Sequence, residues 1–185
     1  MALIQTPEPK LGSRAHAFSL LGTDGRTHTL QSCRGPLGVL VMFICNHCPY
    51  VQAIRDRLVA DMKDLQKTGV GVVAICANDP ADYPEDSYDN LKRQAKEWGF
   101  TFPYLHDESQ LVARAYGAVC TPDFFGFNAD LELQYRGRLD ASKVQPVPNA
   151  PRELYHAMVR IAETGQGPAD QISSMGCSIK WRTAG

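Results

Sequence analysis

The sequence of 185 residues has no long hydrophobic run, no excess of one charge and no internal repeat. Its longest apolar stretch runs from Leu37 to Ile44 and is interrupted by Gly38. That is far too short to cross a bilayer, which takes about 20 apolar residues. The 19 basic and 20 acidic side chains nearly cancel, so no strong field favours nucleic acid or an anionic membrane. We therefore expect neither nucleic acid nor a membrane among the partners.

The start of the chain, MALIQTPEPKLGSR, lacks a basic segment followed by a hydrophobic one, so no secretion signal is visible and we expect a cytoplasmic location. Length and composition predict one globular domain over residues 1–185, with an arm at 1–14, a core at 15–165 and a tail at 166–185. In a cytoplasmic chain, cysteines are not expected to form a structural disulfide framework. The cysteines are Cys33, Cys45, Cys48, Cys76, Cys120 and Cys177.

Short apolar strands alternate with amphipathic helices along the chain. Asp24-Gly25 predicts a hairpin turn, and the apolar runs 37–43 and 70–77 predict strands buried on both faces. Further predicted elements are a hairpin pair at 17–20 and 27–30, a helix after Pro49, a helix capped by Ser87, a strand at 103–106, a short helix with Leu111 and Val112, strands at 123–127 and 131–136, and a last helix from Pro151 to Gly165. This order predicts an α/β fold with helices on both faces of a central sheet.

The motif Cys45-Asn46-His47-Cys48 lies where a predicted buried strand meets the helix after Pro49. We expect Cys45 near the helix N-cap and Cys48 one turn further, with the two sulfurs in reach of each other. Unpaired backbone N–H groups and the helix dipole would stabilise a thiolate at Cys45. A thiol of lowered pKa is both a nucleophile and a good leaving group. The motif predicts a thiol–disulfide oxidoreductase without a cofactor, with Cys45 as nucleophile and Cys48 as resolving thiol.

Half of a zinc site is the alternative interpretation of the cysteine pair. Structural zinc takes four ligands, and the sequence holds no second CxxC or histidine pair, so redox chemistry is favoured and no metal is expected. Two non-redox hypotheses stay open: a binding module without turnover, and a metal-dependent protein using Cys45 and Cys48 with His47 or Cys177. His47 either tunes the thiol pKa as a cation or faces solvent with little effect.

Three segments carry a resemblance to a known family: Phe43 to Val51, the sequence Val119-Cys120-Thr121-Pro122, and the N-terminal hairpin. Together with Met175 to Trp181, they make the chain similar to the peroxiredoxin-like and TlpA-like (AhpC/TSA-type) branch of the thioredoxin superfamily. The resemblance implies a three-layer α/β/α sandwich with a hairpin extension and a C-terminal tail. It also implies a cis peptide bond before Pro122 and substrate binding at Thr121 and Pro122, where the Thr121 backbone would pair with an extended substrate.

The chain also departs from the family pattern. The buried acid of thioredoxins falls here on Val39, so the resemblance identifies no base for Cys48. Peroxiredoxins use Thr-x-x-Cys-Pro, which Cys48-Pro49 fits, but Cys45 takes the place of the threonine and Pro122 that of the essential arginine. Without those groups the transition state of peroxide reduction is less well stabilised. Dithiol exchange is therefore the main hypothesis, and a thiol peroxidase with an antioxidant role is the alternative.

The other cysteines divide by context. Cys76 lies in an apolar strand and is expected to be a core thiol, and Cys33 has no partner readable from the sequence. Cys120 is either a redox neighbour of the site or an inert buried thiol. Cys177 either folds back as a third redox thiol or, in the favoured interpretation, only anchors the tail. The expected partners are a disulfide-containing protein or small-molecule thiol and an electron donor that the sequence does not name.

Overall fold

The computed structural model describes residues 3–183. Its strands are β1 (Leu3–Gln5), β2 (Ser19–Gly22), β3 (Thr27–Thr29), β4 (Gly38–Phe43), β5 (Val70–Cys76), β6 (Tyr104–His106), β7 (Cys120–Thr121), β8 (Asp123–Asn128), β9 (Leu133–Tyr135) and β10 (Met175–Ser178). Its helices are α1 (Leu30–Cys33), α2 (Pro49–Gln66), the 3-10 helix η1 (Pro84–Asp86), α3 (Tyr88–Glu97), α4 (Leu111–Tyr116) and α5 (Glu153–Thr164). Within the described residues, no helix has both the length and the apolar character needed to cross a membrane.

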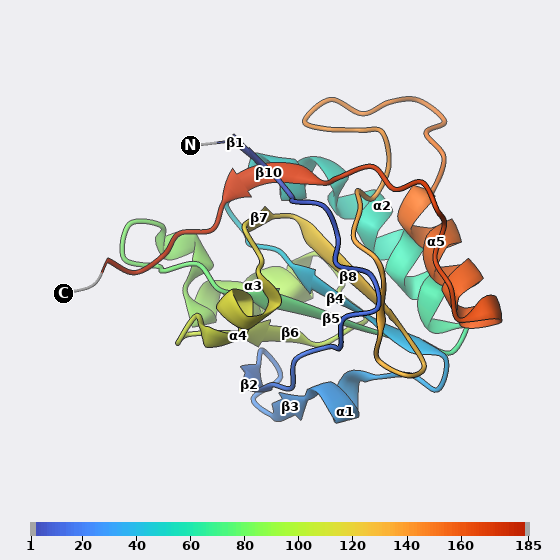
Figure 1. The fold of residues 1–185 in the computed structure, drawn as a ribbon. Coiled ribbons are helices and arrows are strands. Elements are labelled where there is room, and N and C mark those ends of the chain that lie inside the picture. Colours follow the sequence, from blue (N-terminus) through green and yellow to red (C-terminus); the bar gives the residue numbers. More distant parts are fainter. Residues whose placement is uncertain (1–2, 184–185) are drawn as a thin grey trace.

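A mixed sheet forms the centre of the molecule (Figure 1). The strands β3-β2-β6-β5 form one hydrogen-bonded run, and β4-β8-β9 form the other. The two runs meet where β4 lies beside β5, and the Ile44 amide donates to the Ile75 carbonyl at 3.1 Å. The pairs β4–β8 and β2–β3 are antiparallel, whereas β5–β6 is parallel. The predicted hairpin and the predicted buried strands are therefore confirmed.

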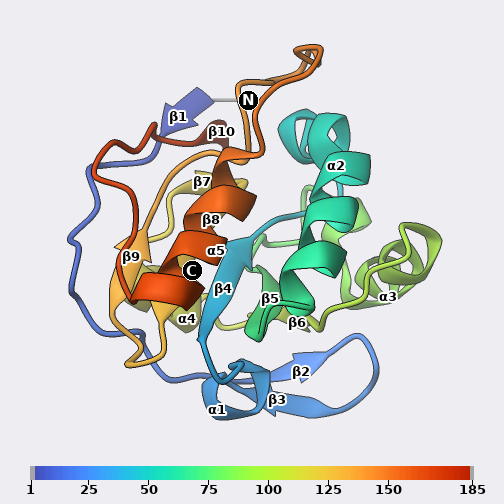
Figure 2. The same ribbon diagram turned by 90° about the vertical axis from the view of Figure 1, so that its right-hand side faces the viewer.

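Helices cover both faces of this sheet, and β4 is buried at every position. Its alternate residues Leu40 and Met42 pack with the apolar faces of α2 and α5, which lie side by side on one face (Figure 2). Val41 and Phe43 face the opposite cluster, which includes residues of α1 and α4. Burial on both faces explains the unbroken apolar run that the sequence shows. The predicted α/β architecture is confirmed.

The helix α2 begins directly after the cysteine motif. Cys48 is its N-cap and Pro49 is its first residue, where a proline loses no hydrogen bond and its fixed φ suits the helix. Cys48 was expected one turn inside the helix, but it is the N-cap itself, because Pro49 sets the helix start; Cys45 lies in the preceding loop, three residues before the N-cap. The predicted inner stripe is correct: its members are all buried, namely Val51, Ile54, Leu58, Met62 and Leu65.

A second, three-stranded sheet of order β1-β10-β7 joins the two ends of the chain (Figure 1). The arm and the tail, predicted without regular structure, each supply a strand. Both β10 pairings are antiparallel, with Cys177 opposite Leu3 on one side and Thr121 on the other. Gly176 permits this close approach, since a Cβ there would lie 1.9 Å from the Thr121 carbonyl oxygen. Four residues with little apolar alternation give no strand signal in the sequence.

Two helix starts also differ from expectation. The second hairpin strand ends at Thr29, whose side chain accepts from the Ser32 amide in a capping box that starts α1. Pro151 was expected in the first turn of the last helix, but Arg152 is the N-cap and α5 starts at Glu153. The helix α1 was not predicted, whereas the start of α5 is only a shift of a predicted boundary; neither changes the layers.

The loop after β7 is held by a buried ion pair. The Thr121–Pro122 peptide bond is cis, as the resemblance implied. Directly after it, the fully buried Asp123 accepts hydrogen bonds from Nε and Nη2 of Arg136 at 3.2 and 2.9 Å. Arg136 also donates to the Gly117 carbonyl at 2.8 Å. The pair therefore ties the Pro122 segment to the end of β9.

We predict that Arg136→Met lowers the free energy of unfolding by about 3–5 kcal/mol, because it leaves the Asp123 carboxylate buried without its partner. Arg138 is the matched control, because it pairs with Glu153 at 2.7 Å with both side chains about a quarter exposed. Arg138→Met should cost about 1 kcal/mol or less, as expected of a partly solvated pair. Urea unfolding of both variants measures the difference, and equal losses would contradict the assignment of the Asp123–Arg136 pair as the stronger tie.

Candidate redox site

Four segments that are distant in the sequence meet at the cysteine motif. The loop Cys45 to Cys48 joins β4 to α2, and η1 brings Asp86 against it. The end of β7 places Thr121 beside both sulfurs, and β10 places Cys177 opposite Thr121. The structure thus brings together the cysteine pair, His47, Thr121 and Cys177, and adds Asp86, which sequence reasoning missed.

The two sulfurs of the motif are buried and share Thr121 as a neighbour. Cys45 is 1% and Cys48 0% exposed. The Sγ of Cys45 lies 3.3 Å from the Thr121 hydroxyl and 3.8 Å from Nδ1 of His47. The Cys48 thiol donates to the Thr121 carbonyl at 3.1 Å. Both thiols therefore have polar partners inside a site closed to solvent.

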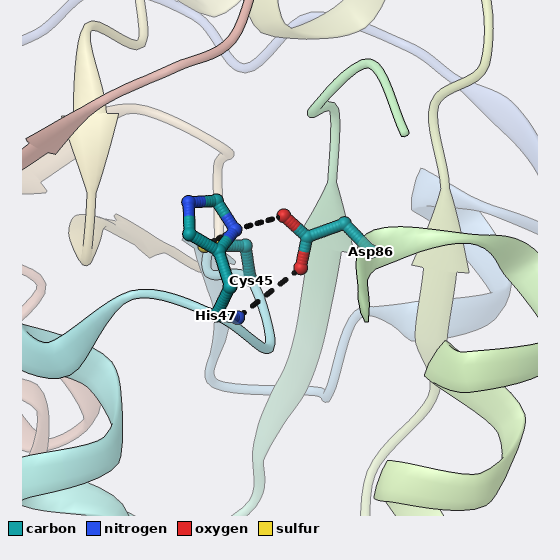
Figure 3. Close-up of side chains that lie close together, drawn as sticks. All are labelled: Cys45, His47 and Asp86. Atoms are coloured by element: carbon teal, nitrogen blue, oxygen red, sulfur yellow. Dashed lines mark hydrogen bonds and ion pairs between the residues drawn. The ribbon is translucent and has the colours of Figure 1, made fainter. Parts of the chain in front are cut away.

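The Asp86 carboxylate lies beside the motif and binds it (Figure 3). It is fully buried and accepts from the amides of Asn46 at 2.7 Å and His47 at 3.3 Å. Its other oxygen bonds Nδ1 of His47 and accepts from the Asn78 side chain at 2.8 Å. Burial opposes ionisation of Asp86, but these hydrogen bonds outweigh it and hold its pKa below the ordinary value. Asp86 is thus a carboxylate that fixes the loop and the imidazole.

His47 is oriented rather than free. One ring nitrogen points at Asp86 and the other points away from it (Figure 3). The ring stacks on Tyr83, with centroids 4.4 Å apart, and its side chain is only 7% exposed. Within residues 3–183, Nε2 of His47 has no hydrogen-bond partner. The interpretation of His47 as a solvent-facing histidine is therefore wrong, whereas its role in tuning the thiols stays a prediction.

Cys45 is held as a protonated thiol. Burial raises its pKa well above the ordinary value, and a hydrogen bond to Cys48 and the negative charge of Asp86 act in the same direction. These surroundings do not favour a thiolate at Cys45, and the role of Cys45 as the attacking thiol stays a prediction. The N-terminal end of α2 acts on Cys48 instead, because Cys48 is the N-cap.

Cys48 is the more acidic thiol. The pKa of Cys48 is lowered to about 5, and the hydrogen bond from Cys45 is the largest cause. Burial raises the pKa, but hydrogen bonds from the Thr121 side chain and from the backbone and side chain of Cys177 lower it further. The Thr121 carbonyl favours only the protonated form, but the donors around the sulfur outweigh it. Near neutral pH Cys48 is therefore a thiolate, which is the reactive form of the side chain.

Asp86 could not be identified from its sequence context. It follows a loop with two prolines, 38 positions beyond Cys48, where the sequence shows only polar residues before the helix cap Ser87. The acid reaches the motif because η1 turns back over the end of β4 and seats its carboxylate on the Asn46 amide. Val39, at the position of the buried acid of thioredoxins, is a core residue here.

One trio of side chains has the composition of a metal site. The donor atoms of Cys45, His47 and Asp86 lie within 4.8 Å of one another. However, Nδ1 of His47 is hydrogen-bonded directly to Asp86, so ligation by both groups would require that bond to open. The hydrogen-bonded arrangement therefore fits a proton-handling site better than a closed zinc site.

The remaining predicted site residues differ in their surroundings. Cys120 is fully buried, its thiol donates to the Pro122 carbonyl at 3.7 Å, and burial raises its pKa, which fits an inert thiol. Thr121 was expected to pair with a substrate, but its backbone is already paired with Cys177 of β10. Arg136 donates two hydrogen bonds to Asp123, the residue that follows Pro122.

The fold and the cysteine pair define a thioredoxin-fold protein. A sequence profile of the AhpC/TSA family matches residues 11–136, and the chain belongs to that family. It is 31% identical over 119 residues to the thiol-disulfide oxidoreductase ResA of Geobacillus thermodenitrificans (strain NG80-2), a match that covers 62% of each chain.

Solved structures extend the likeness to the whole chain. An uncharacterized conserved protein from Geobacillus kaustophilus has a TM-score of 0.94 and 41% identity, over 100% of this chain and 99% of that one. A hypothetical protein from Sinorhizobium meliloti 1021 has a TM-score of 0.90 and 36% identity, over 97% and 99%. The thioredoxin domain of a thiol-disulfide oxidoreductase from Bacteroides vulgatus shares the fold, with a TM-score of 0.57 and 17% identity over 70% and 89%.

We predict that one thiolate titrates with a midpoint of about pH 5, visible in the ultraviolet absorbance of the reduced protein. Because the pKa of Cys48 is lowered, the thiolate is present above this pH and protonated below it. The signal should vanish in Cys48→Ser and persist in the control Cys120→Ser. A midpoint near that of an ordinary thiol, or a signal that survives Cys48→Ser, would contradict the assignment.

A second prediction concerns Asp86. In a Cys48→Ser background, Asp86→Asn should shift the pH profile of Cys45 alkylation to lower pH, because the carboxylate charge helps to raise the Cys45 pKa. Peptide mass analysis after iodoacetamide treatment gives the midpoint of the profile. Asp82→Asn, an exposed position in the same loop, is the matched control and should leave it unchanged. The same midpoint in both variants would show that Asp86 does not act on Cys45.

Proposed function

We propose that this protein is a thiol–disulfide oxidoreductase in which the Cys48 thiolate attacks a partner disulfide and Cys45 resolves the product. The observation that carries the proposal is the position of Cys48 at the N-cap of α2, with donors around its sulfur that lower its pKa to about 5. This assignment reverses the roles expected from the CxxC spacing alone. The family membership and the likeness to a curated oxidoreductase support the reaction class.

The reaction balances as two successive exchanges. The Cys48 thiolate attacks one sulfur of the partner disulfide, forms a mixed disulfide and releases the other sulfur as a thiolate. Cys45 then loses its proton and attacks Cys48 Sγ, which releases the second partner thiolate and forms the Cys45–Cys48 disulfide. Two electrons pass from the cysteine pair to the partner, and an external dithiol or an equivalent electron donor restores the reduced pair.

The second exchange needs an acceptor for the proton of Cys45. Nδ1 of His47 lies 3.8 Å from Cys45 Sγ, but it donates its hydrogen to the Asp86 carboxylate and has no lone pair for that proton. We propose that the partner thiolate released in the first exchange takes it up. Asp86 is therefore a positioning residue, which fixes the motif loop and the imidazole beside Cys45.

The low pKa of Cys48 also bears on the direction of electron flow. A thiol of low pKa is a good leaving group, so a disulfide that contains it is more easily reduced. The same donors stabilise the Cys48 thiolate of the reduced protein. We therefore propose a pair more oxidising than an ordinary dithiol, with a disulfide-bonded protein or a small-molecule thiol as partner.

A cavity of about 230 Å³ lies next to the cis-proline and offers room for such a partner. Tyr50 and Ile54 of α2 line one side, and Pro122 and Met175 line the other. Its lining also includes charged side chains, among them Arg138, Asp140 and Lys143. We propose that side chains flanking the partner's sulfur enter this cavity.

Trapping the mixed disulfide tests the order of attack. Oxidised glutathione is the probe, and intact mass with peptide mapping is the measurement. Cys45→Ser/Cys177→Ser should accumulate a glutathione adduct on Cys48, because the attacking thiolate remains and both neighbouring thiols that could displace glutathione are gone. Cys48→Ser should give no adduct at Cys45, and Cys45→Ser and Cys48→Ser should both lose dithiothreitol-driven insulin reduction. An adduct that forms on Cys45 in Cys48→Ser, and none on Cys48 in Cys45→Ser/Cys177→Ser, would restore the order expected from the spacing.

Peroxide reduction is the second candidate function, favoured by one observation. Cys48 precedes Pro49 at a helix N-terminus as a thiolate, which is the form that reacts with peroxide. Arg136, the first arginine after Pro122 in the sequence, is bound to Asp123. Consumption of hydrogen peroxide by the reduced wild type, measured beside insulin reduction, distinguishes the two activities.

A further inference from the structure

The strand β10 occupies the edge at which a thioredoxin-fold partner was expected to pair. It runs antiparallel to β7, with Cys177 opposite Thr121 and Ser178 opposite Cys120. The Ile179 amide continues the pairing by donating to the Val119 carbonyl at 3.2 Å. The protein therefore places a segment of its own tail, with a cysteine at its centre, along the strand that ends at the cis-proline (Figure 1).

The cysteine on that strand meets the reactive sulfur. Cys177 lies opposite Thr121 in the β10–β7 pairing, and the carbonyl of Thr121 accepts from the Cys48 thiol at 3.1 Å. Cys45, Cys48 and Cys177 belong to the same buried cluster, and the side chain and backbone of Cys177 help to lower the pKa of Cys48. Cys48 thus has one cysteine neighbour in the motif and one in the tail. Cys177 is 3% exposed, so this contact is made inside the closed site.

Anchoring of the tail does not account for a cysteine at this position. The tail is already held by buried neighbours on both sides of Cys177. Ser174 donates to the Pro122 carbonyl at 2.8 Å, and Ile179 is 3% exposed in the core. The Lys180 amide donates to Asn78 at 2.9 Å, and Asn78 in turn bonds Asp86. A thiol is not needed for any of these contacts.

We propose that Cys177 is a third redox thiol, which exchanges with the Cys45–Cys48 disulfide to form a Cys48–Cys177 disulfide. This rests on the proposed function, since it begins from the disulfide that the oxidoreductase cycle produces. The Cys177 sulfur attacks Cys48 Sγ, the S–S bond to Cys45 breaks, and the proton of Cys177 passes to Cys45. One disulfide and one thiol are present before and after, so no further oxidant or reductant is consumed.

The electrostatics of the cluster allow this exchange only after Cys48 is oxidised. In the reduced protein, burial and the neighbouring Cys48 raise the pKa of Cys177 to about 12, so Cys177 holds its proton. When Cys48 enters a disulfide, its negative charge and its hydrogen bond to Cys177 are lost. The thiol of Cys177 then ionises more readily, with Lys180 as a favourable charge nearby. Oxidation of the motif therefore activates the third thiol.

Diamide oxidation of the full chain, followed by alkylation and non-reducing tryptic mapping, tests the proposal. Trypsin separates the three relevant positions on peptides 35–55, 115–136 and 161–180. We expect Cys45→Ser to form a cross-link between peptides 35–55 and 161–180. The cross-link should be lost in Cys45→Ser/Cys177→Ser and retained in Cys45→Ser/Cys120→Ser, whose substitution lies one strand away. Partially oxidised wild type should contain both the internal disulfide of peptide 35–55 and the cross-link to 161–180.

The wild type also separates the two proposals. A Cys45–Cys48 disulfide in the wild type shows that the oxidant reaches the site. The role of Cys177 would then be overturned if Cys45→Ser formed no cross-link and the wild type contained only the internal disulfide. A cross-link to peptide 115–136 instead would assign the role to Cys120 and likewise overturn it. Failure of the wild type to form any disulfide or to reduce insulin would overturn the proposed function itself.

Discussion

The buried Asp86 carboxylate is the constraint on which the site depends. A carboxylate without solvent contact must be fully hydrogen-bonded, and the donors available to it are the loop amides, His47 and Asn78. Satisfying it therefore draws the motif loop, the imidazole and the loop after β5 to one point. Burial of Cys45, together with the charge that Asp86 retains, raises the pKa of Cys45 and leaves Cys48 as the more acidic thiol.

The opposite states of the two thiols have a common origin. Cys45 donates to Cys48, so the proton that stays on one sulfur stabilises the negative charge on the other. The helix N-terminus lies on the side of Cys48, and Asp86 lies on the side of Cys45. The two thiols are thus distinguished by what surrounds them, although both are equally buried.

Much of the fold could be predicted because the burial of a strand or helix follows from the pattern of apolar residues within that element. The apolar run of β4 predicted a buried strand and the apolar stripe of α2 predicted an inward-facing helix, and both predictions are correct. The tail strand β10 was not predictable, because four residues held by pairing to Leu3 and Thr121 carry no local pattern.

The site was predictable only in part, for the same reason. The cysteine motif and the cis-proline loop are each made of consecutive residues, so both could be identified from the sequence. The contact of Asp86 with residues 40 positions earlier exists only in three dimensions. The helix after Pro49 was also found, but the cysteine spacing alone did not show that Cys48 is its N-cap rather than a residue one turn inside it.

The position of β10 in the chain order has a consequence for biosynthesis. It is the last strand of the described chain, whereas the motif follows β4 early in the sequence. A growing polypeptide therefore completes Cys45 and Cys48 long before the segment that covers them has been translated. During that interval the edge of β7 is unpaired and Cys48 lacks the amide of Cys177 as a donor. The acidity of the reactive sulfur is thus a property of the finished molecule, acquired when the final strand docks.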